Sequence, residues 1–121
     1  MLEDRVLYYY RNDYNCAQCM LMGARDEYGL PIECCCVDMC AGVYNGLGVE
    51  SICSIVVGGV MVISLYFKNE NTIKHKRMEF INNIYEKFNT INCGKMPKQN
   101  GCDNIVYEGA KILRIVIVDN I

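Results

Sequence analysis

The apolar positions of the chain recur mainly at helical spacing. Residues 81–88 carry apolar side chains at positions i, i+3, i+4 and i+7, namely Ile81, Ile84, Tyr85 and Phe88. Asp103 can cap a further helix, whose apolar face consists of Ile105, Gly109, Ile112, Leu113 and Val116. Residues 3–12, with apolar side chains at positions 6, 7 and 10, predict a short helix near the start of the chain.

Residues 51–67, SICSIVVGGVMVISLYF, contain no charged side chain. The segment is slightly shorter than the length at which a membrane span is the default interpretation. A helix surrounded by other helices has the same all-round apolar character. We therefore predict a buried central helix over about residues 50–67, in which Gly58 and Gly59 let a neighbouring helix approach closely.

Local signals place the ends of the other helices. Asn15 and Gln18 have the spacing of a capping box, so that a helix begins at Cys16 and runs to about Tyr28, with Gly29 as its terminator. Pro31 suits the first turn of the next helix, which carries IECCCVDMC and breaks at Gly42. We predict loops at the glycine-rich residues 41–49 and at residues 92–102. The helix that contains residues 81–88 lies between these loops and is capped by Asn71 or Thr72.

The last apolar segment, ILRIVIV, is rich in β-branched residues and is compatible with a strand. No other segment offers a strand of comparable clarity to pair with it, so we predict a helix. A chain of 121 residues has the size of one domain. The sequence thus predicts a single cysteine-rich all-α domain over residues 1–121, a bundle of about five helices in up-and-down order.

Charge and composition narrow the function. The net charge of −2 argues against a nucleic-acid-binding surface, and His75, the one histidine, lies in a lysine-rich turn where exposure to solvent is expected. The start of the chain, MLEDRVLYYY, lacks the features of a secretory signal, which favours the cytoplasm. In a reducing compartment, nine cysteines in 121 residues indicate metal binding, catalysis or redox sensing before structural disulfides.

Cys16 has the most informative position among the nine cysteines. A thiolate at the first turn of a helix faces free backbone amides and the positive end of the helix dipole, so we expect its pKa to be lowered. Cys19 lies one turn further on, within reach of Cys16. The pair resembles the helix-start CxxC of thiol oxidoreductases, although the βαβ context of a thioredoxin fold is missing. Two small residues in a helical core remain the alternative.

The other cysteines differ in what they can do. Three successive cysteines cannot all face one site on a helix, so at least one member of the cluster Cys34, Cys35, Cys36 and Cys40 is expected to have no chemical role. Cys53, taken alone, fits a buried structural thiol. Cys93 and Cys102 bracket a loop whose residues Lys95 and Lys98 would stabilise a thiolate, and with residues 16–19 they could complete a four-cysteine site.

Several of these motifs together resemble a known family. YNCAQ, then AGVYNGLG followed by CSIVVGGVMVISL, then INCGKM and a final cysteine at 102 are similar in order and context to the C_GCAxxG_C_C family, to which a redox role is ascribed. The resemblance spans about residues 14–113. It implies an α-helical redox protein whose four named cysteines correspond to Cys16, Cys53, Cys93 and Cys102. Ile52, Ser54 and Ile55 stand where the family has glycine and alanine, and Cys19 and the 34–40 cluster are additional.

Three functions are compatible with this sequence. The first is a thiol redox protein, such as a thiol–disulfide oxidoreductase, in which Cys16 attacks and Cys53, Cys93 or Cys102 resolves the mixed disulfide of a partner protein or small thiol. The second is a zinc or iron–sulfur module whose ligands come from Cys16, Cys19, Cys53, Cys93 and Cys102. The third is a non-catalytic interaction protein. A homodimer is plausible because an apolar helix in a small bundle can leave surface to cover, whereas membrane insertion is not expected.

Overall fold

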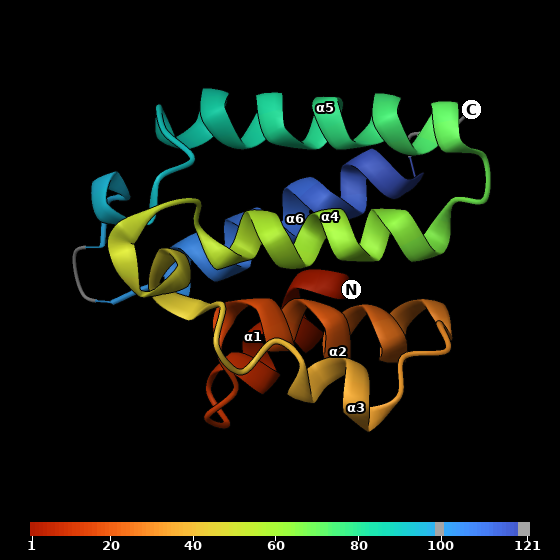
Figure 1. Cartoon of the computed structure of the whole chain (residues 1–121), viewed down its shortest axis with the longest axis horizontal. Helices are drawn as coiled ribbons and strands as arrows, with labels where there is room; N and C mark the ends of the chain where they lie inside the picture. The colour runs from red at the N-terminus through yellow and green to blue at the C-terminus, as the bar shows by residue number, and fades with distance from the viewer. Residues whose placement is uncertain (99–100, 119–121) are drawn as a thin grey trace.

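A computed structural model describes residues 1–98 and 101–118 of the chain (Figure 1). Its α-helices are α1 (Leu2–Tyr10), α2 (Cys16–Tyr28), α3 (Cys34–Asp38), α4 (Ser54–Tyr66), α5 (Glu70–Phe88) and α6 (Asp103–Val118). Two short turns, η1 (Gly46–Glu50) and η2 (Cys93–Lys95), precede α4 and α6. The described residues form no strand, and five of the α-helices are long enough to make a bundle. The predicted all-α fold is confirmed, including the helix rather than strand at residues 112–118.

Helix α4 is the centre of the bundle. It packs against α2 on one side, α5 on the other, and α6 behind it in the view of Figure 1. A side chain on Gly58 would lie only 3.0 Å from the Cα and carbonyl oxygen of Ala17, and one on Gly59 would overlap the ring of Phe80. The absence of charge in residues 51–67 thus reflects a helix surrounded by neighbours, as predicted. No helix within the described ranges is long and apolar enough to span a membrane.

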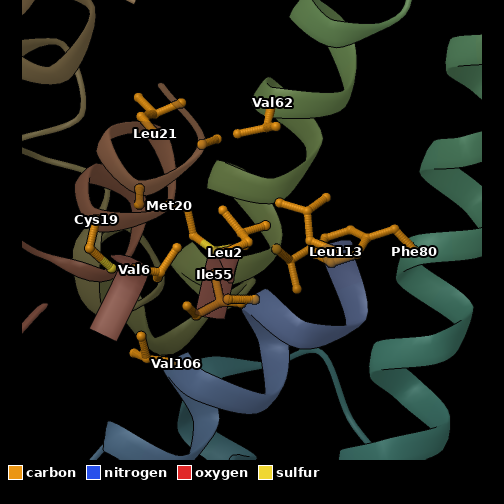
Figure 2. Packing of buried hydrophobic residues seen from close by; sticks show 14 of the residues in the cluster. Leu2, Val6, Cys19, Met20, Leu21, Ile55, Val62, Phe80, Val106 and Leu113 are labelled. Carbon is orange, nitrogen blue, oxygen red and sulfur yellow. The ribbon is translucent and has the colours of Figure 1, made fainter. Parts of the chain in front are cut away.

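The core continues from α4 into the outer helices. Figure 2 shows Leu2 of α1 and Met20 of α2 beside Ile55 of α4, with Leu113 of α6 extending the cluster toward Phe80 of α5. All five side chains are essentially inaccessible to solvent. Such burial of apolar surface is the main favourable term in folding. The first and last helices, α1 and α6, therefore both contribute to the core.

An ion pair also joins the first helix to the last. The Arg114 guanidinium donates to both carboxylate oxygens of buried Glu3, at 2.8 and 3.1 Å. Burial alone would raise the pKa of Glu3, but these hydrogen bonds and the charge of Arg114 outweigh burial and lower it. Glu3 can therefore be buried as a carboxylate because Arg114 satisfies both of its oxygens.

The predicted capping box of α2 is present. The Asn15 side chain accepts from the Gln18 amide at 2.9 Å, the Gln18 side chain accepts from the Asn15 amide at 3.1 Å, and Gly29 ends the helix in the left-handed conformation. The same two side chains donate to the carbonyls of Cys40 and Val37. The cap thereby fixes the start of α2 against the segment that contains α3.

Three predicted helix starts are wrong. The central helix begins at Ser54 rather than near residue 50, because residues 51–53 pair with another segment. Helix α3 begins at Cys34, three residues after Pro31, which is therefore not in its first turn. Helix α5 is capped by Asn69, whose side chain accepts from the amides of residues 71 and 72 at 2.9 and 3.2 Å. Asn71 and Thr72, the predicted caps, are thus the donors and not the cap.

The order of the helices also departs from simple up-and-down. Residues 29–53 carry the chain back along the bundle, so that α4 starts at the same end as α2 (Figure 1). Helix α6 starts there as well, whereas α1 and α5 end there. Three helix N-termini therefore gather at one end of the molecule.

The contact between α2 and α4 predicts a stability effect. Gly58→Val places atoms against the backbone of Ala17, and overpacking of this kind costs about 1–3 kcal/mol. We expect a lower midpoint in urea unfolding followed by far-ultraviolet circular dichroism. Gly42→Val is the matched control, because a side chain at Gly42 meets nothing within 4 Å. Equal midpoints for the two variants would contradict the close packing of these helices.

Candidate functional site

Four cysteines from distant parts of the sequence meet at the end where the three helices begin. Cys16, Cys53, Cys93 and Cys102 all line one cavity of about 240 Å³. Its other lining residues are Tyr10, Asn15, Tyr44, Asn45, Ser54, Lys98 and Ile105. The convergence predicted from the sequence is confirmed. Cys16 is the first residue of α2, while Cys53 and Cys102 directly precede α4 and α6.

A short antiparallel bridge between Ile52 and Asn92 positions two of these thiols. The Cys53 amide donates to the Ile91 carbonyl at 2.8 Å, and the Cys93 amide donates to the Ser51 carbonyl at 2.6 Å. Successive side chains of an extended segment point to opposite faces. Ile52 and Asn92 accordingly face solvent, while Cys53 and Cys93 point inward and are each only 5% exposed.

The backbone approaches Cys93 closely on a second side. Gly46 has φ of +60°, and a side chain there would lie 2.9 Å from the Cβ of Cys93 and 2.3 Å from the amide nitrogen of Ser51. Only glycine fits such a position without strain. The glycine-rich segment of residues 41–49 therefore forms one wall of the cavity, to which it also contributes Tyr44 and Asn45.

Cys102 is the thiol of the cavity whose pKa is lowered. The Cys102 sulfur accepts hydrogen bonds from Cys16 and Tyr10, and the hydrogen bond from Cys16 together with the positive charge of Lys98 lowers the pKa of Cys102 to about 6. The same hydrogen bond, burial and the neighbouring thiols raise the pKa of Cys16. Our expectation of a lowered pKa at Cys16 is therefore wrong. Cys16 is the more deeply buried of the two thiols, so it keeps the proton and donates it to Cys102.

Lys98 reaches into the cavity, as the sequence suggested for the loop of residues 92–102. Its ammonium lies 2.9 Å from the sulfur of Cys93, which also contacts the side-chain oxygen of Asn45 at 3.6 Å. The contact with Cys93 raises the pKa of Lys98, and burial raises that of Cys53. Lys95, the other lysine we expected to help, is exposed and does not line the cavity.

The remaining cysteines lie outside this cavity. Cys19 is completely buried in the core, where its thiol donates to the Cys16 carbonyl at 3.2 Å and burial raises its pKa to about 12. Cys34 and Cys35 are exposed, and Cys36 and Cys40 line a different hollow. Within residues 1–98 and 101–118, no group of three or more histidine, cysteine or acidic side chains is arranged to hold a metal ion.

Sequence reasoning missed the polar residues that complete the site. Tyr10 ends α1 and hydrogen bonds to Cys102, yet nothing in the run of three tyrosines distinguishes it from Tyr8 and Tyr9. Tyr44 and Asn45 were detectable only as part of the glycine-rich segment. Helix periodicity gives no information on loop side chains, and these contacts depend on how the loops fold against the bundle.

The hydrogen bond between Cys16 and Cys102 predicts a pH effect. In the native protein, alkylation of Cys102 followed by peptide mass spectrometry should increase with pH to a plateau with a midpoint near 6. Cys16→Ala removes the main cause of the lowered pKa, so the midpoint should rise toward the ordinary value of 9.0. Cys34→Ala, at an exposed position, should leave it unchanged. A native Cys102 whose rate still climbs up to pH 9 would contradict the assignment.

Lys98 predicts a smaller shift in the same measurement. Lys98→Gln should raise the Cys102 midpoint less than Cys16→Ala does, because Lys98 acts on Cys102 only through its charge, whereas Cys16 donates a hydrogen bond to it. Lys95→Gln is the control of equal charge change at an exposed position outside the cavity. If both lysine variants shift the midpoint alike, the effect is one of overall charge and not of the contact at the site.

Comparison with known proteins agrees with the arrangement of the site. Searches of curated proteins and of solved structures gave no significant match. The family described as "Putative redox-active protein (C_GCAxxG_C_C)" matches residues 14–116, which include all four cysteines of the cavity. Because that match covers most of the chain, this protein belongs to the C_GCAxxG_C_C family.

Proposed function

We propose that this protein is a dithiol reductant that transfers two electrons to a disulfide through Cys102 and Cys16. The observation that carries the proposal is that Cys16 and Cys102 line the same cavity, where their interaction raises the pKa of Cys16 and lowers that of Cys102 and so pairs a thiol with a thiolate. A thiolate is the nucleophile of thiol–disulfide exchange, and the most effective attacking thiol has a pKa near the ambient pH. The family's redox description supports the same class of chemistry.

The reaction has two steps. The Cys102 thiolate attacks one sulfur of the substrate disulfide, so that a mixed disulfide forms and the other substrate sulfur leaves as a thiolate. Cys16 then gives its proton to a leaving sulfur and attacks Cys102, which forms the Cys16–Cys102 disulfide and releases the second substrate thiol. The pair gives up two electrons and the one proton of Cys16, and solvent supplies the second proton that the two substrate thiols take up. This assignment makes Cys102 the attacking and Cys16 the resolving cysteine, the reverse of the sequence-based hypothesis.

The cavity suits this exchange in two further respects. Cys102 and Cys16 are both partly exposed whereas Cys53 and Cys93 are buried, so an incoming disulfide meets the first pair before the second. Lys98 offers a positive charge that stabilises thiolate intermediates. Cys53 and Cys93, inward-facing on the same bridge, form a second pair that can return electrons to the first by the same chemistry.

The proposal is tested by oxidising the reduced protein, purified without oxygen, with a small disulfide such as oxidised glutathione. We expect the intact mass to fall by two hydrogens and peptide mapping to place the new disulfide between Cys16 and Cys102. Cys16→Ser should instead accumulate a mixed disulfide on Cys102, since the resolving thiol is missing. Cys19→Ser, which changes the buried thiol one turn away, should still form the native disulfide.

Two outcomes would overturn the proposal. One is a disulfide that joins other cysteines while Cys16 and Cys102 stay reduced. The other is a protein that does not react with disulfides although Cys102 alkylates normally. The second outcome would leave a nucleophile without a resolving partner, and would favour a different use of the thiolate.

A further inference from the structure

A second group of sulfur atoms lies outside the thiol cavity. Cys36, Met39, Cys40 and Met61 line a hollow of about 170 Å³ between the α3 segment and α4. The rest of its lining is aliphatic: Leu21, Ile32 and Leu65. No charged side chain, imidazole or carboxylate contributes to this lining, so every atom there that can bind a metal through a side chain is sulfur. Neither the family motif nor the proposed redox reaction uses these residues.

The sulfur atoms are close enough to share one ion. The Cys40 sulfur lies 3.7 Å from the Met61 sulfur and 3.7 Å from the Cys36 carbonyl. Two sulfur ligands at about 2.3 Å from a three-coordinate metal would be about 4.0 Å apart. The Cys40 and Met61 sulfurs are thus nearly at ligand separation. Cys36, one turn before Cys40, lines the same hollow as the third sulfur.

The chemistry of these donors selects the ion. Thiolate and thioether sulfur are soft ligands that favour Cu(I), whereas zinc sites use thiolate, imidazole or carboxylate and normally four ligands. The burial of Cys40, only 1% exposed, disfavours a bare thiolate. A cation bound next to the sulfur removes that penalty. Met61 is partly exposed, at 39%, so an ion can reach the site from solvent.

We propose that Cys36, Cys40 and Met61 form a Cu(I) site separate from the redox cavity. One Cu(I) displaces the two thiol protons and binds two thiolates and one thioether, so the site gains no electron and loses none. Met39, highly exposed at the rim of the hollow, is placed to cover the ion. Because protons are displaced, the apparent affinity for Cu(I) increases with pH.

The test is an anaerobic titration of the reduced protein with Cu(I) in competition with a chromogenic Cu(I) chelator. The thiols of the redox cavity can also bind Cu(I). The quantity compared is therefore the number of tightly bound Cu(I) ions per protein, in each variant and in the native protein. Cys36→Ser, at a partly exposed position, should lose one equivalent. Met61→Leu should weaken that equivalent by at least the roughly tenfold that even a supporting residue of a metal site contributes.

Matched controls make the result specific. Cys34→Ser and Met78→Leu change an exposed thiol and an exposed thioether elsewhere, and both should bind Cu(I) like the native protein. Copper X-ray absorption of the native complex should report sulfur ligands only. Circular dichroism of Cys36→Ser and Met61→Leu should match the native spectrum, because both side chains are partly exposed and neither is among the buried core residues.

The proposal fails if Cys36→Ser and Met61→Leu bind as many Cu(I) ions as tightly as the native protein. It also fails if the tight equivalent disappears in Cys102→Ser but not in Cys36→Ser, since the ion then sits in the redox cavity. Zn(II) competing on equal terms with Cu(I) would likewise exclude a thioether ligand. None of these outcomes bears on disulfide exchange by Cys16 and Cys102, so the two proposals stand or fall separately.

Discussion

The close contact of α4 with α2 is the constraint on which the rest of the structure depends. Gly58 lets the backbone of α4 lie against Ala17, in the first turn of α2. Because the contact falls near the start of both helices, it aligns their N-termini and brings Cys16 beside Cys53. Helices α5 and α6 then cover the remaining faces of α4. A bulkier residue at Gly58 would separate the helices and the thiols together, so stability and site geometry have the same origin.

Burial and charge determine which of the four thiols of the cavity becomes a thiolate. Each thiolate costs desolvation, and each additional one repels those already present. Lys98 is the one cationic side chain among the described residues that line the cavity. Its charge can stabilise one thiolate, and a second thiolate would cost more free energy because it would be repelled by the first. The first negative charge settles on the sulfur that accepts the most hydrogen bonds, Cys102, and leaves Cys16 protonated. The asymmetry gives two chemically identical residues different roles.

Much of the fold was predictable because the relevant signals are local. The capping box of Asn15 and Gln18, the left-handed Gly29 and the apolar face of α6 all act within a few residues. The start of α4 was not predictable, since residues 51–53 are extended only through pairing with residues 91–93. The pKa of Cys16 was predicted with the wrong sign for a similar reason. Its position at a helix start is local, whereas its burial and its bond to Cys102 arise from the tertiary structure.

In the candidate site, too, local sequence signals were predictive and effects of the tertiary structure were not. Cysteine positions in the sequence predicted which thiols converge, but two lysines in one loop looked equivalent until the backbone placed Lys98 inside and Lys95 outside the cavity. Whether the four cysteines are catalytic remains a prediction.

The bridge between Ile52 and Asn92 sets how the deeper thiols are reached. Two backbone hydrogen bonds hold it, each contributing about 0.5–1.5 kcal/mol, and the Ile52 side chain is already in solvent. Separating these two segments therefore costs far less than unfolding the helices behind them. Cys53 and Cys93 are each 5% exposed, so their access to larger reactants would depend on such a local opening. The stability of this bridge would then set the fraction of time during which the second thiol pair is accessible to a reactant.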